Sequence, residues 1–368
     1  MISFNDIFED KTKDGTKIKT NEYKGQGKHI IIDQGQNAIA GYTNLDEGLF
    51  EDVPAIIFGD HTRIIKFIDT PFFIGADGVK ILKAKEKNAN YKYLYYALKN
   101  VNIPNTGYNR HFKWLKEAKI KYPDQNIQCK IVKVLDTISK VILLKNKQIE
   151  LLDEIVKARF IEMFGDPVIN PMQWDKVKLN TCLRNIENGK SFICDGIPRI
   201  EENPAILKLS AVTTGIYNPE ENKAIIDKND FVESAEVHKG DLLFTRKNTP
   251  ELVGMAAYVS STPGKLMMPD LIFRLNTNLK CNKVYLWKLI NHDLFRKQIQ
   301  NIASGSAKSM SNISKARLEN LSICLPPIKQ QNQFADFVQQ VDKSKVAIEK
   351  SLKETQLLFD SLMQKYFG

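Results

Sequence analysis

The chain has 368 residues, 43% of them hydrophobic, and a formal net charge of +10 at pH 7. This length exceeds one usual hydrophobic core, and no segment is low-complexity, so we expect more than one folded domain. No apolar run is long enough to span a membrane and the first residues are not a signal peptide, which predicts a cytoplasmic protein without a membrane partner. Five cysteines without CxxC spacing and five histidines without HExxH spacing predict reduced thiols and no metal site.

Residues 1–121 are predicted to form a globular domain of mixed α and β structure. Four short β-branched runs, each bounded by Gly, Asp or Pro, indicate strands, and a helical pattern follows them at Tyr91 to Lys99. The predicted strands are Lys28 to Asp33, Ala55 to Phe58, Ile64 to Ile68 and Gly78 to Leu82.

Residues 122–166 are predicted to form one long helix. Pro123-Asp124 is a start signal, and Gly165 followed by Pro167 is a stop signal. Apolar residues spaced alternately by four and three place one stripe against a partner helix. The stripe positions are Ile131, Leu135, Ile138, Ile142, Lys145, Ile149, Leu152, Val156, Arg159 and Met163.

A second globular domain is predicted at 167–325, and a second long helix at 326–368 that begins at Pro326-Pro327. In the domain a helical pattern runs from Val284 to Gln300, after strands at Ala205 to Leu209, Asp241 to Thr245, Met255 to Ser260 and Leu271 to Leu275. The stripe of the second helix is Phe334, Val338, Val341, Lys345, Ile348, Leu352, Thr355, Phe359, Leu362 and Tyr366.

The two helical regions repeat each other at a constant offset, because 326 − 123, 331 − 128 and 368 − 165 all equal 203. We therefore expect an α+β protein in which two globular domains are joined by two long antiparallel coiled-coil helices with pseudo-twofold symmetry. Pairing of each helix in trans, in a dimer, is the alternative. Polar residues interrupt each stripe. They either fix the helix register or extend their aliphatic carbons past the edge of the stripe, so that the polar groups reach solvent. The interruptions are Lys145, Arg159, Lys345 and Thr355.

The order of these segments resembles the specificity subunit of a type I restriction-modification enzyme over the full length of the chain. The helix starts at 122–128 (Tyr-Pro-Asp-Gln-Asn-Ile-Gln) and 325–331 (Leu-Pro-Pro-Ile-Lys-Gln-Gln) are similar to the family's Leu-x-Pro-Pro-x-x-Glu-Gln, with Ile127 and Gln330 replacing its glutamate. Further similar phrases are Gln34-Gly35, Ile39 to Tyr42, Pro54 to Gly59, Trp174 to Leu179 and Gly240 to Phe244.

The resemblance implies two target recognition domains, each reading one half of a split site in double-stranded DNA, and two conserved helical regions. It also implies two methyltransferase subunits and restriction or translocase subunits as partners. S-adenosylmethionine, ATP and Mg are expected on those partners, with no cofactor on this chain. The positive charge independently favours a nucleic-acid partner, although many lysines fall on the helices, where a solvated face explains them equally well.

Two loops in each domain are the candidates to contact DNA, because base edges and phosphates are bound by multi-donor side chains on loops. The first loop follows the central strand, at 61–63 and 246–248, and the second precedes the long helix, at 105–111 and 304–309. For each residue a solvated loop side chain is the alternative, and for Tyr108 a core position. The candidates are His61, Arg63, Thr106, Tyr108, Asn109, Arg110, Arg246, Lys247, Ser306 and Lys308.

Catalytic motifs are missing from the sequence. There is no Asn/Asp-Pro-Pro-aromatic motif of an amino methyltransferase, no Pro-Asp…Glu-x-Lys nuclease pattern and no GxxxxGK[ST] phosphate loop. We therefore expect a non-catalytic subunit. The alternative function is a coiled-coil scaffold whose globular domains grip proteins and do not read DNA sequence.

Overall fold

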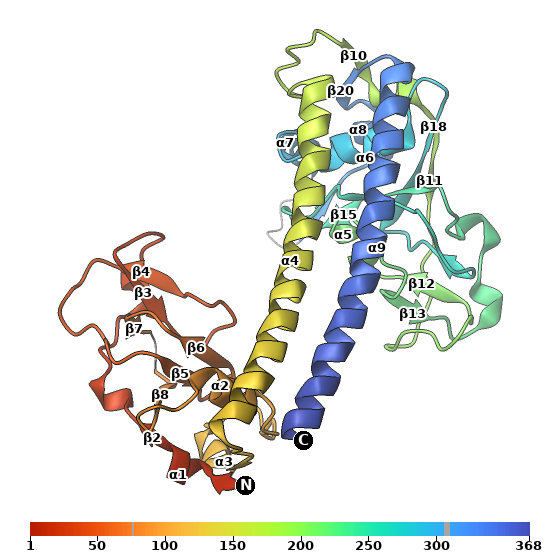
Figure 1. Cartoon of the computed structure of the whole chain (residues 1–368). Coiled ribbons are helices and arrows are strands. Elements are labelled where there is room, and N and C mark those ends of the chain that lie inside the picture. Colours follow the sequence, from red (N-terminus) through yellow and green to blue (C-terminus); the bar gives the residue numbers. More distant parts are fainter. Residues whose placement is uncertain (76, 305–309) are drawn as a thin grey trace. The chain divides into compact units, whose positions relative to one another are not determined.

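The computed structural model describes residues 1–75, 77–304 and 310–368 (Figure 1). The chain forms two compact units, the first from Met1–Lys147 with Glu349–Gly368 and the second from Gln148–Ile348. Two helices of 40 residues, α4 (Gln125–Phe164) and α9 (Ile328–Phe367), run through both units. Each unit therefore contains one mixed α/β head and part of each long helix.

The head of the first unit is built on two sheets. The antiparallel sheet has the order β2-β8-β5-β6, and a smaller sheet has the order β4-β3-β7 with β3 and β7 parallel. All of β5 is buried, with Ile56 and Phe58 in the core beside the helices and Ala55 and Ile57 in the core beside the smaller sheet. Alternate residues of a strand face opposite sides, so a strand covered on both sides reads as one apolar run.

The bounds in this head agree closely with the predicted strands and helix. Asn90 caps α2 by accepting a 3.1 Å hydrogen bond from the Tyr93 amide, which explains the helix start. The elements are β1 (Ile2–Ser3), α1 (Phe4–Ile7), β2 (Phe8–Asp10), β3 (His29–Ile32), β4 (Gly41–Thr43), β5 (Ala55–Gly59), β6 (Ile65–Ile68), β7 (Phe72–Ile74), β8 (Val79–Ala84), α2 (Tyr91–Lys99), α3 (Phe112–Lys116) and β9 (Lys119–Ile120).

The second head repeats this topology with strands in the same chain order. Its sheets are β11-β18-β14-β16 and β13-β12-β17, again with one parallel pair, and β10 pairs with β20 as β1 pairs with β9. One short pair, β15 with β19, is added. The elements are β10 (Asp175–Lys178), β11 (Leu183–Asn188), β12 (Ala205–Leu207), α5 (Ser210–Thr213), β13 (Asn222–Ala224), β14 (Leu242–Thr245), β15 (Lys247–Asn248), β16 (Ala256–Tyr258), β17 (Leu266–Met267), β18 (Ile272–Thr277), α6 (Lys283–Asn291), α7 (Arg296–Asn301), β19 (Ser311–Asn312), α8 (Lys315–Glu319) and β20 (Ser322–Leu325).

Two predicted bounds in the second head are wrong. The segment from Val284 to Gln300 forms two helices, because His292 is extended and the Asn291 side chain is held by both the amide and the carbonyl of Ala256 in β16. Leu209, predicted as a strand residue, has helical backbone angles and precedes α5.

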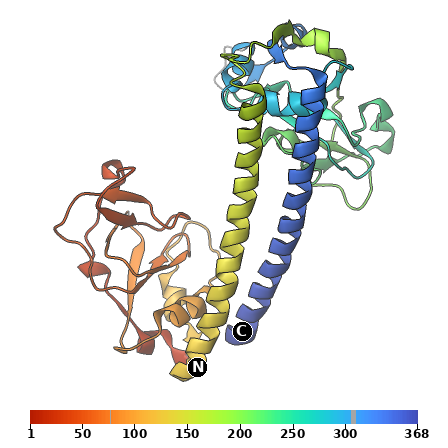
Figure 2. The same cartoon turned by 45° about the horizontal axis from the view of Figure 1, so that its top comes forward.

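The long helices pair with each other inside the chain and run antiparallel (Figure 2). In the first unit, Ile131 and Leu135 of α4 share a core with Phe359 and Met363 of α9. In the second unit, Val156, Phe160 and Phe164 of α4 pack with Phe334, Val338 and Val341 of α9. Every predicted stripe position is buried or partly buried, so the predicted seam is confirmed.

The polar seam residues have specific partners. Lys145 donates to the hydroxyls of Ser351 and Thr355, the latter at 3.1 Å. Lys345 donates to both carboxylate oxygens of Asp153, at 2.7 and 2.8 Å. Because these bonds form only when the opposing residues are aligned, the lysines favour one register of the helix pair.

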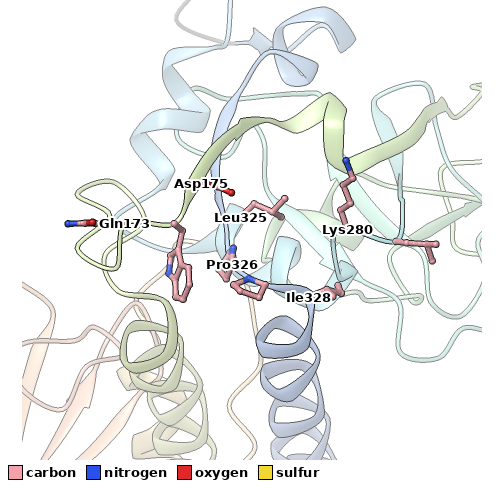
Figure 3. A pocket seen from close by; sticks show the side chains of 9 residues that line it. Gln173, Asp175, Lys280, Leu325, Pro326 and Ile328 are labelled. Atoms are coloured by element: carbon pink, nitrogen blue, oxygen red, sulfur yellow. The ribbon is translucent and has the colours of Figure 1, made fainter.

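The ends of the long helices are set as predicted. Gly165 has φ +73, a left-handed conformation that stops α4. The side chain of Asp124 caps the start of α4 through the Ile127 amide at 3.0 Å. The start of α9 borders a pocket of about 410 Å³ whose lining includes Leu325, Pro326 and Ile328 (Figure 3).

Within the described ranges, no helix combines the length and apolar character that a membrane span requires.

Candidate nucleic-acid interface

In the first head the structure brings the two predicted loops together. The turn at 60–64 joins β5 to β6, and the loop at 104–111 precedes α3. The His61 and Tyr108 rings stack, with centroids 4.7 Å apart and an interplanar angle of 7°, and His61 Nδ1 lies 3.2 Å from the Asn109 carbonyl oxygen. The Tyr108 side chain is 88% exposed, which excludes the alternative of a core tyrosine. A stacked aromatic pair with an exposed tyrosine, beside polar groups, is suited to contact bases or phosphates.

A buried junction holds these loops to each other. The carbonyl oxygen of Asp60 accepts from the His111 amide at 2.8 Å and lies 2.9 Å from His111 Nδ1, which donates as the ring's protonated nitrogen. The Asp60 carboxylate accepts from the Phe112 amide at 2.7 Å and so caps α3. His111 is fully buried and Asp60 is 3% exposed. The position of the loop at 104–111 therefore depends on these two residues.

The other predicted residues of the first head have different surroundings. Asn109 donates from its side chain to the Thr106 carbonyl oxygen at 2.6 Å, and Gly107 at φ +78 permits this tight turn. Arg110 is exposed. The pKa of the nearby Asp77 carboxyl is lowered mainly by a hydrogen bond and the charge of Lys17, with a smaller effect of the Arg110 charge.

Arg63 is separated from the stacked pair. Its backbone is left-handed, with φ +62, and its Nη1 donates to the Ile103 carbonyl oxygen at 3.2 Å. His61 contacts Tyr108 and Asn109, whereas Arg63 contacts Ile103, so the two side chains have different partners among the described residues.

Gln34 is a site residue that the sequence did not identify as such. Its Oε1 accepts from the His61 amide at 3.2 Å, and its Nε2 donates to the Asp77 carbonyl oxygen at 3.1 Å. Its own carbonyl oxygen accepts from the Thr62 hydroxyl at 2.6 Å. Gln34 therefore fixes the turn that carries His61. In the sequence, Gln34 stood out only because Gln34-Gly35 is similar to a pattern in the first domain of the family.

In the second head, the first predicted loop pairs with Ser311 and Asn312, which follow the second predicted loop in the sequence. Lys247 pairs with Asn312 in the short β15–β19 ladder, and Arg246 Nη2 donates to Asn312 Oδ1 at 3.3 Å. The Arg246 guanidinium lies over the Phe273 ring, 5.0 Å from its centroid. Ser306 and Lys308 lie outside the residues that the structure describes. Asn312 is a further residue that sequence reasoning missed.

Asp60 and Arg246 occupy the same place in the two heads. Each follows the central strand, and its amide donates to the residue just before the neighbouring strand, Gly78 or Leu271, at 2.7 and 3.0 Å. Each carbonyl oxygen accepts, at 2.8 Å, an amide from the residues just before the next short helix, His111 before α3 or Ile313 before α8. The backbone frame is thus duplicated, whereas an acid stands at this position in one head and a base in the other.

Of the predicted site residues, Arg63 lines a cavity in the first head. The pocket at the start of α9 includes none of the predicted site residues (Figure 3). Across 1–75, 77–304 and 310–368, no group of three or more His, Cys, Asp or Glu side chains is placed to hold a metal ion.

Comparison with solved structures places the fold in a known class. The crystal structure of the S subunit of a type I restriction-modification system from M. genitalium matches with a TM-score of 0.61 and 16% identity, covering 100% of this chain and 95% of that chain. At this identity the match concerns the fold alone.

Sequence comparison then gives the family. Residues 1–154 and 171–357 match the type I restriction modification DNA specificity domain, and the chain belongs to this family. It is 30% identical over 199 residues to the EcoEI specificity subunit of Escherichia coli, and 27% identical over 207 residues to the putative MjaX specificity subunit of Methanocaldococcus jannaschii. These matches cover 52% and 54% of this chain but 33% and 46% of the two relatives, so the chain spans less than half of their length.

Proposed function

We propose that this chain is the DNA-specificity subunit of a type I restriction-modification complex, acting in the cytoplasm. The segments 1–121 and 167–325 serve as target recognition domains, and each reads one half of a bipartite double-stranded site. The observation that carries this proposal is the duplicated backbone frame after the central strand, which supports the stacked His61–Tyr108 pair in one head and Arg246 in the other. Two recognition domains that share one backbone arrangement but present different side chains are suited to an asymmetric DNA site.

In each head the proposed contacts come from the two predicted loops. His61, Tyr108, Asn109 and Arg110 supply stacking, amide and cationic groups in the first head, with Thr106 supporting the turn. Arg246 and Lys247 serve in the second head, together with Ser306 and Lys308. Arginine, lysine and asparagine are common donors to base edges and phosphates, and loops present them without disturbing the core.

The helical regions 122–166 and 326–368 are proposed to set the distance between half-sites and to bind two methyltransferase subunits. Exposed apolar residues lie at equivalent places on the two helices, because 346 − 143 and 358 − 155 both equal 203. Leu143 and Leu358 belong to the first unit, and Ile155 and Val346 to the second. Each unit thus presents exposed apolar residues at equivalent helix positions, as expected if two copies of one partner bind.

Methyl transfer, DNA cleavage and ATP-driven translocation are assigned to partner subunits, together with S-adenosylmethionine, ATP and Mg. This chain acts as a non-catalytic subunit that positions them. Its own side chains bind DNA and hold the partners, and no step of bond making is assigned to them.

Binding to duplex DNA separates this function from a protein-binding scaffold. The chain in complex with its methyltransferase partner is expected to bind a target duplex at physiological salt, with affinity that falls steeply as salt rises, because phosphate contacts release counterions. Fluorescence anisotropy with target and scrambled duplexes measures both properties. Equal affinity for every sequence at physiological salt would contradict the recognition role and favour the scaffold.

A further inference from the structure

The first head has a second polar feature apart from the stacked His61–Tyr108 pair. A cavity of about 440 Å³ is lined by the loop after β3, the start of β6 and the carboxyl end of α2 with the residues that follow it. Its polar lining residues are Gln36, Arg63, Lys99 and Asn102, and the others are apolar. None of the lining residues is acidic, so the cavity carries two positive charges and neutral amides.

The backbone of Arg63 directs this side chain to the cavity. The turn is closed by hydrogen bonds from the Arg63 amide to the Gly59 carbonyl oxygen at 2.7 Å and from the Gly59 amide to the Ile64 carbonyl oxygen at 2.8 Å. It requires φ +62 at Arg63, an uncommon conformation for a residue with a side chain. One guanidinium N–H binds the Ile103 carbonyl oxygen, and this bond leaves the other donors of the fork for a ligand.

Lys99 is the last residue of α2 and adds the second charge. Its ammonium lies 5.4 Å from the centroid of the Tyr95 ring, and its side chain is exposed. In the described part of the chain, neither Lys99 nor Arg63 forms an ion pair. Two cations without carboxylate partners at one cavity repel each other, and a shared anion removes that repulsion.

We propose that this cavity binds a single phosphate of the DNA backbone, shared by Arg63 and Lys99, with the amides of Gln36 and Asn102 as neutral donors. The inference rests on the proposed function, and it gives Arg63 a role in holding phosphate that is distinct from base reading by His61 and Tyr108. Phosphate suits the cavity because a guanidinium fork with an ammonium binds phosphate oxygens, and because Arg63 lies in the same turn as His61, a proposed DNA contact.

The test measures the salt dependence of duplex binding by the whole chain in complex with its methyltransferase partner. The variants are Lys99→Ala, Arg63→Gln and the double variant, and Lys87→Ala is the matched control. Lys87 is an exposed lysine just before α2, at the end of that helix opposite to Lys99. Among the residues that the structure describes, Lys99 forms no side-chain hydrogen bond that supports the fold, so Lys99→Ala remains informative if Arg63→Gln disturbs the turn.

Loss of a single phosphate contact reduces the slope of log affinity against log salt by about 0.9. Between 50 and 200 mM salt, the affinity of the unmodified complex is therefore expected to fall about 3.5-fold more than that of the double variant. In each single variant the slope is expected to fall by no more than it does in the double variant, because both cations bind the same phosphate. Lys87→Ala is expected to keep the original slope.

Two results would overturn the inference while leaving the proposed function intact. One is an unchanged slope in both Lys99→Ala and the double variant. The other is a slope reduced by about two units in the double variant, which would mean two independent contacts. If the unmodified complex binds no duplex DNA, the proposed function fails and this inference fails with it.

Discussion

Replacing His111 by alanine is expected to abolish reading of one half-site while the other half-site is still read. The Asp60 carbonyl oxygen would keep the His111 amide but lose its second donor at 2.9 Å, and removal of the buried imidazole would leave a cavity; together these losses cost about 1–3 kcal/mol. The loop at 104–111 would then separate from the His61 turn. We expect the Phe112 amide, which donates to the Asp60 carboxylate, to exchange hydrogen roughly 5- to 150-fold faster. Hydrogen exchange and the methylated DNA motif measure these two consequences.

Conservative variants distinguish a positioning role from general loss of structure. Asparagine places its amide nitrogen near the position of Nδ1, whereas glutamine reaches the position of Nε2, which has only a 3.5 Å contact with Thr106. We expect His111→Asn to restore the half-site and His111→Gln to fail. The matched control is Ser314→Ala, since 314 − 111 = 203 and Ser314 caps α8 through the Arg317 amide at 3.3 Å. A folded His111→Ala variant with an unchanged motif would refute the positioning role.

Insertion of one heptad into both long helices is expected to lengthen the unread gap of the DNA site by about three base pairs. The insertions follow Lys145 and Ile348, which are equivalent because 348 − 145 = 203. Seven helical residues add about 10.5 Å, and the rise per base pair is about 3.4 Å. A heptad also preserves the apolar seam, because the stripe repeats every seven residues. Mapping the methylated motif of the variant measures the gap.

Insertion into only one helix is the control for this experiment. It displaces the opposing residues by a heptad and takes the Lys345–Asp153 pair out of register. We expect this variant to lose recognition of the bipartite site. An unchanged gap after insertion into both helices would contradict the idea that the helices set the spacing.

The long helices could be predicted from sequence because their information is local and repeated. A seven-residue pattern, a proline start and a glycine stop each act over a few residues, and the bounds of α4 and α9 follow from them. The partners of Lys145 could not be predicted in the same way. Ser351 lies 206 residues away, and only the antiparallel pairing brings it to the lysine.

The sequence allowed candidate loops to be named, but not the contacts that the structure shows in the first head. His111 lies in a polar segment that is typical of an exposed loop, yet it is fully buried. It packs against the turn at Asp60, which lies 51 residues earlier and binds the His111 ring. Arg63 follows His61 by two residues, but its backbone is left-handed and its side chain lines a cavity away from the His61–Tyr108 pair. Such features depend on contacts between distant segments, which residue type and spacing do not encode.

The central claim is that this chain directs methylation to a bipartite DNA sequence. Genome-wide mapping of methylated adenines, in cells with and without this gene, tests it most directly. The proposed function predicts a motif of two specified blocks, separated by an unread gap of fixed length, that is methylated only when the gene is present. An identical set of methylated motifs in both strains, with the methyltransferase partner expressed, would contradict it.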